Sequence, residues 1–414
     1  MLYQWHEFWR AGMAPFADWA EVGARAFSAP GTWLAAWPEA PRIAAGYELL
    51  HRLGKEYEKP TFGITLVDAH GHACPVLEQE VMATPFCRLL RFRRTADDAA
   101  VLDRLNQDPA VLVVAPLSGH HATLLRDTVR TLLRDHDVYI TDWVDARLVP
   151  AVAGAFSLDD YVATIQAFIT RLDAAQLHVV SVCQSTVPVL AAVALQSARG
   201  MATPRSLVMM GGPIDSRESP TAVNALATRK SLAWFETNLI HQVPANYPGR
   251  GRRVYPGFLQ HAGFLAMNPE RHMQSHWDFY CHLVRGDLDD AQAHRRFYDE
   301  YNAVLDMPAE YYLDTVRIVF QEHLLANGAW HVAGERVDPG AIRDTAIFTI
   351  EGELDDICGL GQTRAAHALC TGLPDAQRAH LTVAGAGHYG IFSGRRWREQ
   401  VYPQVRDFIV RHGA

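Results

Sequence analysis

Short apolar runs alternate with amphipathic segments along residues 61–212 of this chain, and the alternation returns at residues 341–414. Six runs in the first stretch are rich in β-branched residues and have the length of buried strands. They are Gly63–Val67, Arg88–Phe92, Val111–Pro116, Val138–Thr141, His178–Cys183 and Ser206–Gly211. Because strands that alternate with helices form parallel sheets, the pattern predicts a doubly wound, mostly parallel α/β sheet.

The clearest helix of the first stretch begins at Ser157. Asp160 follows three residues later, which predicts a capping box with Asp in the place of Glu. Apolar side chains then recur at helical spacing and share one face. They are Tyr161, Ile165, Phe168, Ile169 and Leu172. A buried helix is also predicted over the alanine-rich run Val187–Leu195.

Residues 213–340 interrupt the alternation. The segment is rich in aromatic residues, has mostly helical patterns and contains a Pro/Gly loop at residues 244–257. It lies between the two α/β stretches, so we expect it to be an inserted helical lid or cap. The alternative is a helical elaboration without a gating role.

Residues 1–60 form a separate, aromatic-rich segment with the spacing of one or two short amphipathic helices. The aromatic residues are Tyr3, Trp5, Phe8, Trp9, Phe16, Trp19 and Phe27. The prolines expected to break the chain after them are Pro30, Pro38 and Pro41. Trp5, Phe8 and Trp9 share a helical face. This face either packs on the main domain or is a foot for a hydrophobic surface.

Composition narrows the classes of function. The chain has 414 residues and 49% hydrophobic content, enough for one large domain or a domain with an insertion. A net charge of −8 excludes a global basic field for nucleic acid. No run approaches the roughly 20 apolar residues of a membrane span, and no secretory signal is visible. We therefore expect a soluble, cytoplasmic protein.

The six cysteines contain no CxxC pair and are widely spaced, so neither a disulfide framework nor a zinc site is expected. Cys183 is different, because an apolar run leads directly into it and an apolar helical pattern follows. Ser181 and Ser185 flank it at the positions where glycine is usual in a nucleophile elbow. A helix N-terminus favours the reactive thiolate form of cysteine. The alternative is a small, buried hydrophobic residue.

Two partners for a thiol nucleophile follow in the order nucleophile, acid, histidine. Asp355 comes just after the apolar strand pattern of residues 346–351, although Asp356 could take its place. His388 stands in a Gly-rich loop after another strand pattern, and residues 362–370 predict a helix between the two. Together the three motifs predict a Cys-His-Asp triad.

An oxyanion hole needs two backbone N–H groups. Gln184, which follows the cysteine, is one candidate, and Leu117 or Ser118 in the loop after an earlier strand is the other. His120 and His121 lie in the same loop, but no third ligand stands nearby, so no metal is expected.

A small basic cluster lies in the inserted segment. It consists of Arg250, Arg252 and Arg253. A solvated loop is expected there, and the alternative is a site for a phosphorylated acyl acceptor such as coenzyme A.

Five motifs resemble those of intracellular poly(3-hydroxybutyrate) depolymerases. They are Met1–Trp5, Ala115–His121, Ser181–Ser185, Gly352–Asp356 and Ala386–Gly390. The resemblance implies an α/β-hydrolase fold with a lid, and Cys183, Asp355 and His388 as the triad. It also implies a polyester granule as substrate, no required cofactor and a cytoplasmic location on granules, while coenzyme A could be an acyl acceptor and a homo-oligomer could form.

The chain is more distantly similar to polyester synthases, which also carry a cysteine on this fold. Two other functions therefore stay open: a synthase-like acyltransferase, and a catalytically inactive granule-surface protein. An intact triad speaks against the inactive protein.

Overall fold

The computed structural model describes residues 2–413, and its centre is a sheet of nine strands in the order β1-β2-β3-β5-β4-β6-β7-β13-β14. The strands are β1 (Leu66–Ala69), β2 (His72–Ala83), β3 (Cys87–Arg94), β4 (Ala110–Val114), β5 (Asp137–Trp143), β6 (Leu177–Val182), β7 (Ser206–Met210), β13 (Ala346–Gly352) and β14 (Arg378–Val383). Strands β1, β2 and β3 pair antiparallel with one another, and β3 is also antiparallel to β5. The six strands β5-β4-β6-β7-β13-β14 are parallel to one another. This order, with one antiparallel strand next to the parallel set, is the α/β-hydrolase fold, as the sequence predicts.

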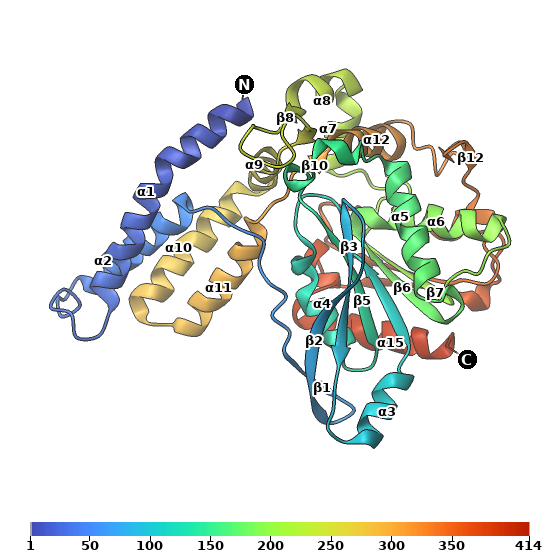
Figure 1. Cartoon of the computed structure of the whole chain (residues 1–414), viewed down its shortest axis with the longest axis horizontal. Coiled ribbons are helices and arrows are strands. Elements are labelled where there is room, and N and C mark those ends of the chain that lie inside the picture. The colour runs from blue at the N-terminus through green and yellow to red at the C-terminus, as the bar shows by residue number, and fades with distance from the viewer. Residues whose placement is uncertain (1, 414) are drawn as a thin grey trace.

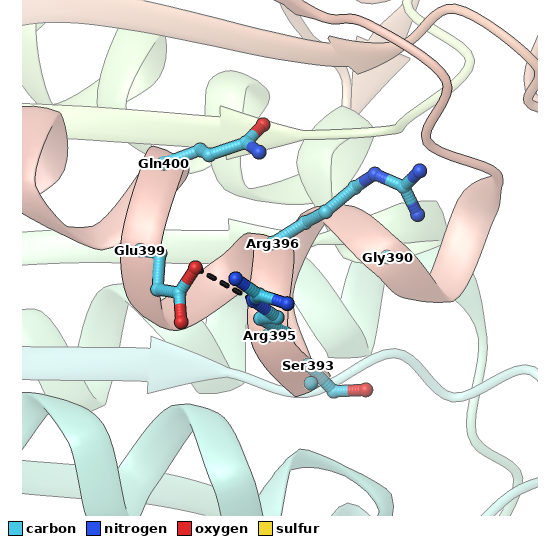
Figure 2. Close-up of a pocket in the computed structure, with 7 residues that line it drawn as sticks. Gly390, Ser393, Arg395, Arg396, Glu399 and Gln400 are labelled. Carbon is cyan, nitrogen blue, oxygen red and sulfur yellow. Dashed lines mark hydrogen bonds and ion pairs between the residues drawn. The ribbon is translucent and has the colours of Figure 1, made fainter.

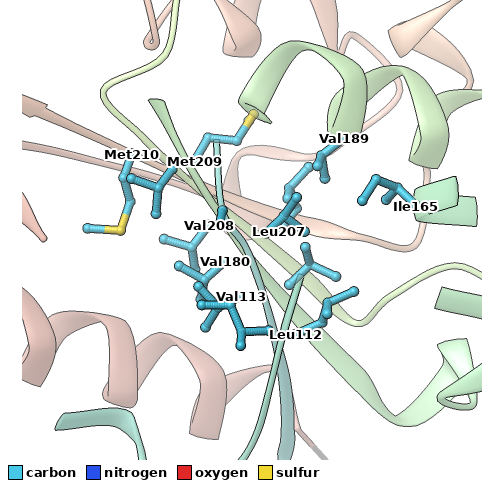
Figure 3. Packing of buried hydrophobic residues seen from close by; sticks show 14 of the residues in the cluster. Leu112, Val113, Ile165, Val180, Val189, Leu207, Val208, Met209 and Met210 are labelled. Atoms are coloured by element: carbon cyan, nitrogen blue, oxygen red, sulfur yellow. The ribbon is translucent and has the colours of Figure 1, made fainter. Parts of the chain in front are cut away.

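The parallel strands are apolar because helices cover both of their faces. Every residue of β6, β7 and β13 is buried. Figure 3 shows side chains of β4, β6 and β7 packed against Ile165 and Val189 from the helices. A continuous β-branched run is typical of such strands.

Seven helices of residues 2–413 belong to this body. They are α3 (Ala99–Gln107), α4 (Arg126–Leu132), α5 (Leu158–Arg171), α6 (Thr186–Ala198), α13 (Ala366–Leu369), α14 (Gly394–Arg396) and α15 (Tyr402–Arg411). The predicted capping box of α5 is confirmed, since Ser157 and Asp160 bond reciprocally. Helix α6 is buried over most of its length, as its apolar pattern indicates.

Some predicted boundaries are wrong. The sequence pattern missed β2, because most of its side chains are exposed and leave no apolar run. The strand predicted from Gly63 begins at Leu66, and β6 ends at Val182, so Cys183 lies outside it. Only α13 is α-helical within residues 362–370, since turns occupy residues 361–365.

Residues 213–340 are mostly helical, as their pattern predicts, and lie between β7 and β13. The helices are α7 (Ala222–Arg229), α8 (Leu232–Leu239), α9 (Gly257–Met267), α10 (Pro269–Arg285), α11 (Leu288–Tyr301) and α12 (Ala309–Thr315). Short strands accompany them: β8 (His241–Gln242), β9 (Arg253–Tyr255), β10 (Met307–Pro308), β11 (His331–Val332) and β12 (Glu335–Arg336). Below, "inserted segment" means residues 213–340.

The N-terminal residues form a helical hairpin rather than short, broken helices. Helix α1 (Leu2–Ser28) has 27 residues and continues through Pro15. Pro41 does not break the chain but lies in the first turn of α2 (Ala40–Gly54), where a missing N–H costs nothing. Figure 1 shows α1, α2, α10 and α11 side by side, projecting from one side of the sheet. Within residues 2–413, no helix combines the length and apolar character of a transmembrane span.

Candidate active site

Cys183 occupies a sharp turn between β6 and α6. Its backbone has φ +57°, in the left-handed region that side chains other than glycine rarely adopt. The residue is half-buried, whereas the strand before it and the helix after it are buried. Strain of this kind is concentrated at functional sites, and here it falls on the candidate nucleophile.

The two serines that replace glycine at the elbow are both completely buried. The Ser185 hydroxyl accepts a hydrogen bond from Val182 N–H at 2.9 Å, and lies 2.9 Å from the Val114 carbonyl. Ser181 donates to the Val208 carbonyl at 3.2 Å. Each hydroxyl therefore bonds to strand backbone, which explains how the turn accepts serine.

A glycine that the sequence analysis missed lies against the elbow. A Cβ on Gly212 would stand 1.8 Å from Thr186 Oγ1 and 2.4 Å from the Cys183 carbonyl oxygen. No side chain fits there without moving α6 or the turn. Gly212 follows the end of β7, so only the neighbouring position of β6 and β7 in the sheet reveals its importance.

The structure brings His388 and Asp355 together. His388 Nδ1 lies 2.7 Å from Asp355 Oδ2, and both side chains are almost fully buried. The other carboxylate oxygen accepts hydrogen bonds from the N–H groups of Ile357 at 2.9 Å and Cys358 at 2.8 Å. Cys183 acts on the same imidazole, because its charge raises the pKa of His388. Because Asp355 holds Nδ1, Nε2 is the ring nitrogen left to exchange a proton with the sulfur.

The charges around His388 determine its protonation. Burial alone would lower the pKa of this imidazole. The negative charge of Cys183, then the charge and hydrogen bond of Asp355, outweigh burial and hold the pKa of His388 well above its usual value. The arrangement therefore favours the protonated form of His388.

Replacing Cys183 with alanine should lower the pKa of His388, because one of the two anions that stabilise the imidazolium is lost. NMR titration of the imidazole Cε1–H signal, assigned with a His388→Gln variant, measures this shift. Cys281→Ala is the matched control, since Cys281 is also half-buried and free. An unchanged His388 titration in Cys183→Ala would show that the two side chains do not interact.

Of the two carboxylates that the sequence leaves open, Asp355 is the one that contacts the histidine. Asp356 is exposed and accepts a hydrogen bond from Asn268 Nδ2 at 3.2 Å, at the start of α10. Glu351, which the sequence analysis did not single out, is buried and accepts backbone N–H bonds from the turn after Asp355. The donors are Gly361, Thr363 and Arg364. This carboxylate holds the loop that carries Asp355.

The loop after β4 leaves the sheet beside the elbow. Val114 pairs with Ser181 in register, so Leu117 and Ser118 follow the same sheet edge as Gln184. The loop is held by the inserted segment, because Leu305 N–H donates to the Gly119 carbonyl at 2.7 Å. The position is compatible with N–H groups converging on one oxygen, and the oxyanion role of these residues stays a prediction.

Comparison with known families adds a finding that does not depend on this geometry. Residues 211–413 match the family described as PHB de-polymerase C-terminus. The C-terminal half of the chain belongs to this family. The chain is accordingly a hydrolase of carboxylic esters. Residues 211–413, below called the PHB depolymerase region, contain the inserted segment, Asp355 and His388. Cys183 precedes this region. No curated protein matches the sequence.

Solved structures with a similar fold are enzymes of several kinds. A Paleococcus ferrophilus monoacylglycerol lipase is 14% identical over 73% of this chain and 94% of its own, with a TM-score of 0.43. The 2-hydroxy-6-oxo-6-phenylhexa-2,4-dienoate hydrolase of Rhodococcus sp. strain RHA1 is 13% identical over 81% of this chain and 99% of its own, with a TM-score of 0.43. The thioesterase domain of the curacin biosynthetic pathway is 11% identical over 81% of this chain and 99% of its own, with a TM-score of 0.42. The strand order, rather than these distant similarities, identifies the fold.

Two tyrosines that the sequence analysis did not select lie near the sulfur. Tyr389 follows His388 in the PHB depolymerase region, and Tyr311 comes from α12. Burial raises the pKa of both phenols, and the charge of Cys183 raises them further. Both side chains therefore stay neutral beside the thiol. Position next to His388 could have suggested Tyr389, whereas no sequence signal indicated Tyr311.

The histidine pair of the β4 loop packs against other residues as neutral rings. His120 stacks on Phe264 at 4.8 Å between ring centroids, and its Nε2 lies 3.1 Å from the Tyr301 carbonyl. Burial lowers the pKa of His120 to about 4 and that of His121 to about 3. Through these contacts His120 joins the loop to the inserted segment.

The prediction of a solvated loop is wrong for one member of the basic cluster, Arg252, whereas Arg250 and Arg253 are exposed as expected. Arg252 is buried and donates to three backbone carbonyls. They belong to Val149 at 3.0 Å, Pro150 at 2.7 Å and Gly154 at 2.6 Å. Arg253 pairs with Glu236 at 2.6 Å. Two of the three guanidinium groups are thus occupied by this chain, so the cluster offers little for an external phosphate.

A cavity of about 500 Å³ lies next to the histidine loop, and Figure 2 shows side chains that line it. Its lining runs from Gly390 to Gln400 and includes Arg395, whose guanidinium pairs with Glu399 at 2.8 Å. None of the candidate catalytic residues lines it.

Proposed function

We propose that this protein cleaves the ester bonds of poly(3-hydroxybutyrate) with Cys183 as nucleophile, His388 as base and acid, and Asp355 as the orienting carboxylate. The hydrogen bond between Asp355 and His388, together with the influence of Cys183 at a strained elbow on the same imidazole, carries the proposal. The match of residues 211–413 to the PHB de-polymerase family supports the polyester as substrate.

The first half of the reaction forms a thioester. The proton of the Cys183 thiol passes to His388 Nε2, which gives a thiolate and the imidazolium that the site favours, and the thiolate sulfur attacks the carbonyl carbon of a chain ester. The tetrahedral intermediate collapses, the carbon–oxygen bond to the leaving alkoxide breaks, and His388 returns the proton to that oxygen. Asp355 keeps Nδ1–H directed away from the sulfur and stabilises the imidazolium.

The second half releases the acyl group. His388 removes a proton from water, the water oxygen attacks the thioester carbonyl, and the sulfur leaves and recovers its proton. The N–H groups of Gln184 and of Leu117 or Ser118 would bind the oxyanion in both halves. Coenzyme A in place of water would give a hydroxyacyl-CoA instead of free 3-hydroxybutyrate or its oligomers. An enzyme with this substrate would work in the cytoplasm at the polymer granule.

Incubation with amorphous poly(3-hydroxybutyrate) granules, with and without coenzyme A, tests the proposal. We expect soluble 3-hydroxybutyrate or short oligomers to be released, as measured by liquid chromatography and mass spectrometry. The Cys183→Ala variant, treated in parallel, is expected to release none. An enzyme that leaves granules intact but lengthens polymer from hydroxyacyl-CoA would be a synthase-like acyltransferase, and the proposal would be wrong.

A further inference from the structure

Helix α1 carries a row of large apolar side chains that the described chain leaves largely exposed. We call it the α1 stripe. It consists of Leu2, Trp5, Phe8, Trp9, Phe16 and Trp19, whose exposed fractions range from 44% to 78%. Their spacing of three, four and seven residues puts them on one face of the helix. A patch of this size on a folded protein marks a contact surface.

The stripe lies beside the face that packs, and the two meet at Trp19, whose ring contacts Tyr47 edge to face at 5.1 Å. Tyr3, Ala17 and Ala20 are the buried residues of α1. Gly23 lies against the Tyr47 ring of α2, where an added Cβ would be 3.0 Å from ring atoms. The hairpin therefore packs mainly through small residues of α1, and most of the aromatic surface of the stripe is left exposed.

The exposed aromatic surface continues to the tip of the hairpin. Trp33 and Trp37, in the connection between α1 and α2, are 70% and 47% exposed. Their rings meet edge to face at 5.4 Å, and Phe27 contacts Trp37 in the same way at 6.3 Å. Edge-to-face aromatic pairs are favourable, so these contacts stabilise the arrangement of the rings at the tip.

Polar contacts fix the hairpin to the inserted segment. The Tyr3 hydroxyl donates to Asp306 Oδ2 at 2.6 Å, and both groups are buried. In addition, Arg295 pairs with Glu48 at 2.6 Å, and Arg52 with Asp299 at 2.9 Å. The hairpin projects beside α10 and α11 in Figure 1. The stripe is thus held at a set position relative to the rest of the enzyme.

We propose that the α1 stripe, together with Trp33 and Trp37, is the surface by which this enzyme docks on solid polyester. The inference rests on the proposed function for the identity of the polymer. Poly(3-hydroxybutyrate) is uncharged, and its surface presents methyl and methylene groups with ester carbonyls. Indole rings match both, because they bury a large apolar area and their N–H can donate to a carbonyl.

Charge favours the polymer over a membrane. The stripe contains no charged residue, and α1 as a whole has three carboxylates against two arginines. Both arginines are paired within the hairpin: Arg10 with Glu7 and Glu56, and Arg25 with Glu21. An anionic bilayer attracts clusters of free Lys or Arg, which this helix lacks. A neutral apolar surface is the better complement.

Adsorption of the full chain to amorphous poly(3-hydroxybutyrate) particles tests the docking surface. The test variant combines Trp5→Ser, Phe8→Ser and Trp9→Ser. We expect its adsorption constant to fall by about tenfold or more, since three aromatic contacts are lost. Turnover of a short soluble ester and thermal unfolding are measured in parallel. The ratio of adsorption to soluble-ester turnover is expected to fall by the same factor.

A matched control combines Leu77→Ser, Val152→Ser and Val410→Ser, three exposed apolar residues outside the hairpin. Equal adsorption by the test variant and wild type would overturn the inference, as would an equal loss in the control. Stronger wild-type binding to phospholipid vesicles than to polymer would also overturn it. So would a wild-type dimer in light scattering that the test variant loses, because the stripe would then join two copies.

The two proposals fail in different ways. If wild type adsorbs through the stripe but releases no soluble product, the docking surface stands and the proposed function is wrong. If wild type depolymerises the particles and the stripe variant adsorbs and depolymerises equally well, the function stands and the docking surface is wrong.

Discussion

Cys183→Ala should abolish ester cleavage, with a fall in kcat of about 10⁴-fold or more, as for loss of the nucleophile in other triads. The fold should persist, because the side chain is half-buried at a turn and loses one atom. Alanine also keeps the left-handed strain of this position. Cys183→Gly should be as inactive as Cys183→Ala. Its free energy of unfolding should be higher than that of Cys183→Ala by about 1 kcal/mol, since glycine adopts φ +57° without strain.

Turnover of soluble ester and of polymer, with thermal unfolding of each variant, checks these expectations. Cys281→Ala is the control for loss of a half-buried thiol and should retain full activity. Cys183→Ser should retain little activity, because a hydroxyl is far less acidic than a thiol. Normal turnover by Cys183→Ala would exclude the thioester mechanism.

Asp355→Asn should reduce kcat by about 10⁴-fold, because the orienting carboxylate holds the productive tautomer of the histidine. Asp355 accepts from His388 through one oxygen and from two backbone N–H groups through the other. An amide has one acceptor oxygen, so its NH₂ group must face a donor on one side. His388 then loses its partner or takes the wrong tautomer.

Asp356→Asn is the matched variant, with the same change at the next position. Asp356 is exposed and accepts only from Asn268 among its hydrogen bonds within the described residues, so a change of less than about tenfold is expected. Steady-state kinetics on a soluble ester compares the two, with circular dichroism to check folding. The reverse order of effects would make Asp356 the acid and contradict the geometry.

Local patterns predicted several parts of this protein correctly. The capping box at Ser157 and the apolar run of α6 were readable because each depends on neighbours within one or two helical turns. The strands β4, β6 and β7 were readable because burial on both faces requires a continuous apolar run. Strand β2 was missed, since its side chains are mostly exposed and hydrogen bonds to neighbouring strands define it.

Other features depend on contacts between distant parts of the chain. Ser185 replaces glycine because the Val114 carbonyl, 71 residues away, lies beside its hydroxyl. Arg252 is a structural residue because carbonyls about 100 residues earlier surround it. Asp355 contacts His388 because β13 and β14 are neighbours in the sheet, whereas the chain pattern left Asp356 open.

The sequence by itself therefore determined the α/β architecture, the order of the three candidate catalytic residues and the aromatic character of the N-terminus. These depend on the spacing of residues along the chain. Only the tertiary structure decided which carboxylate reaches the histidine, which arginine is buried and which aromatic face stays exposed. These depend on the partners that the folded chain brings near, because burial and hydrogen bonding are set by neighbours in space.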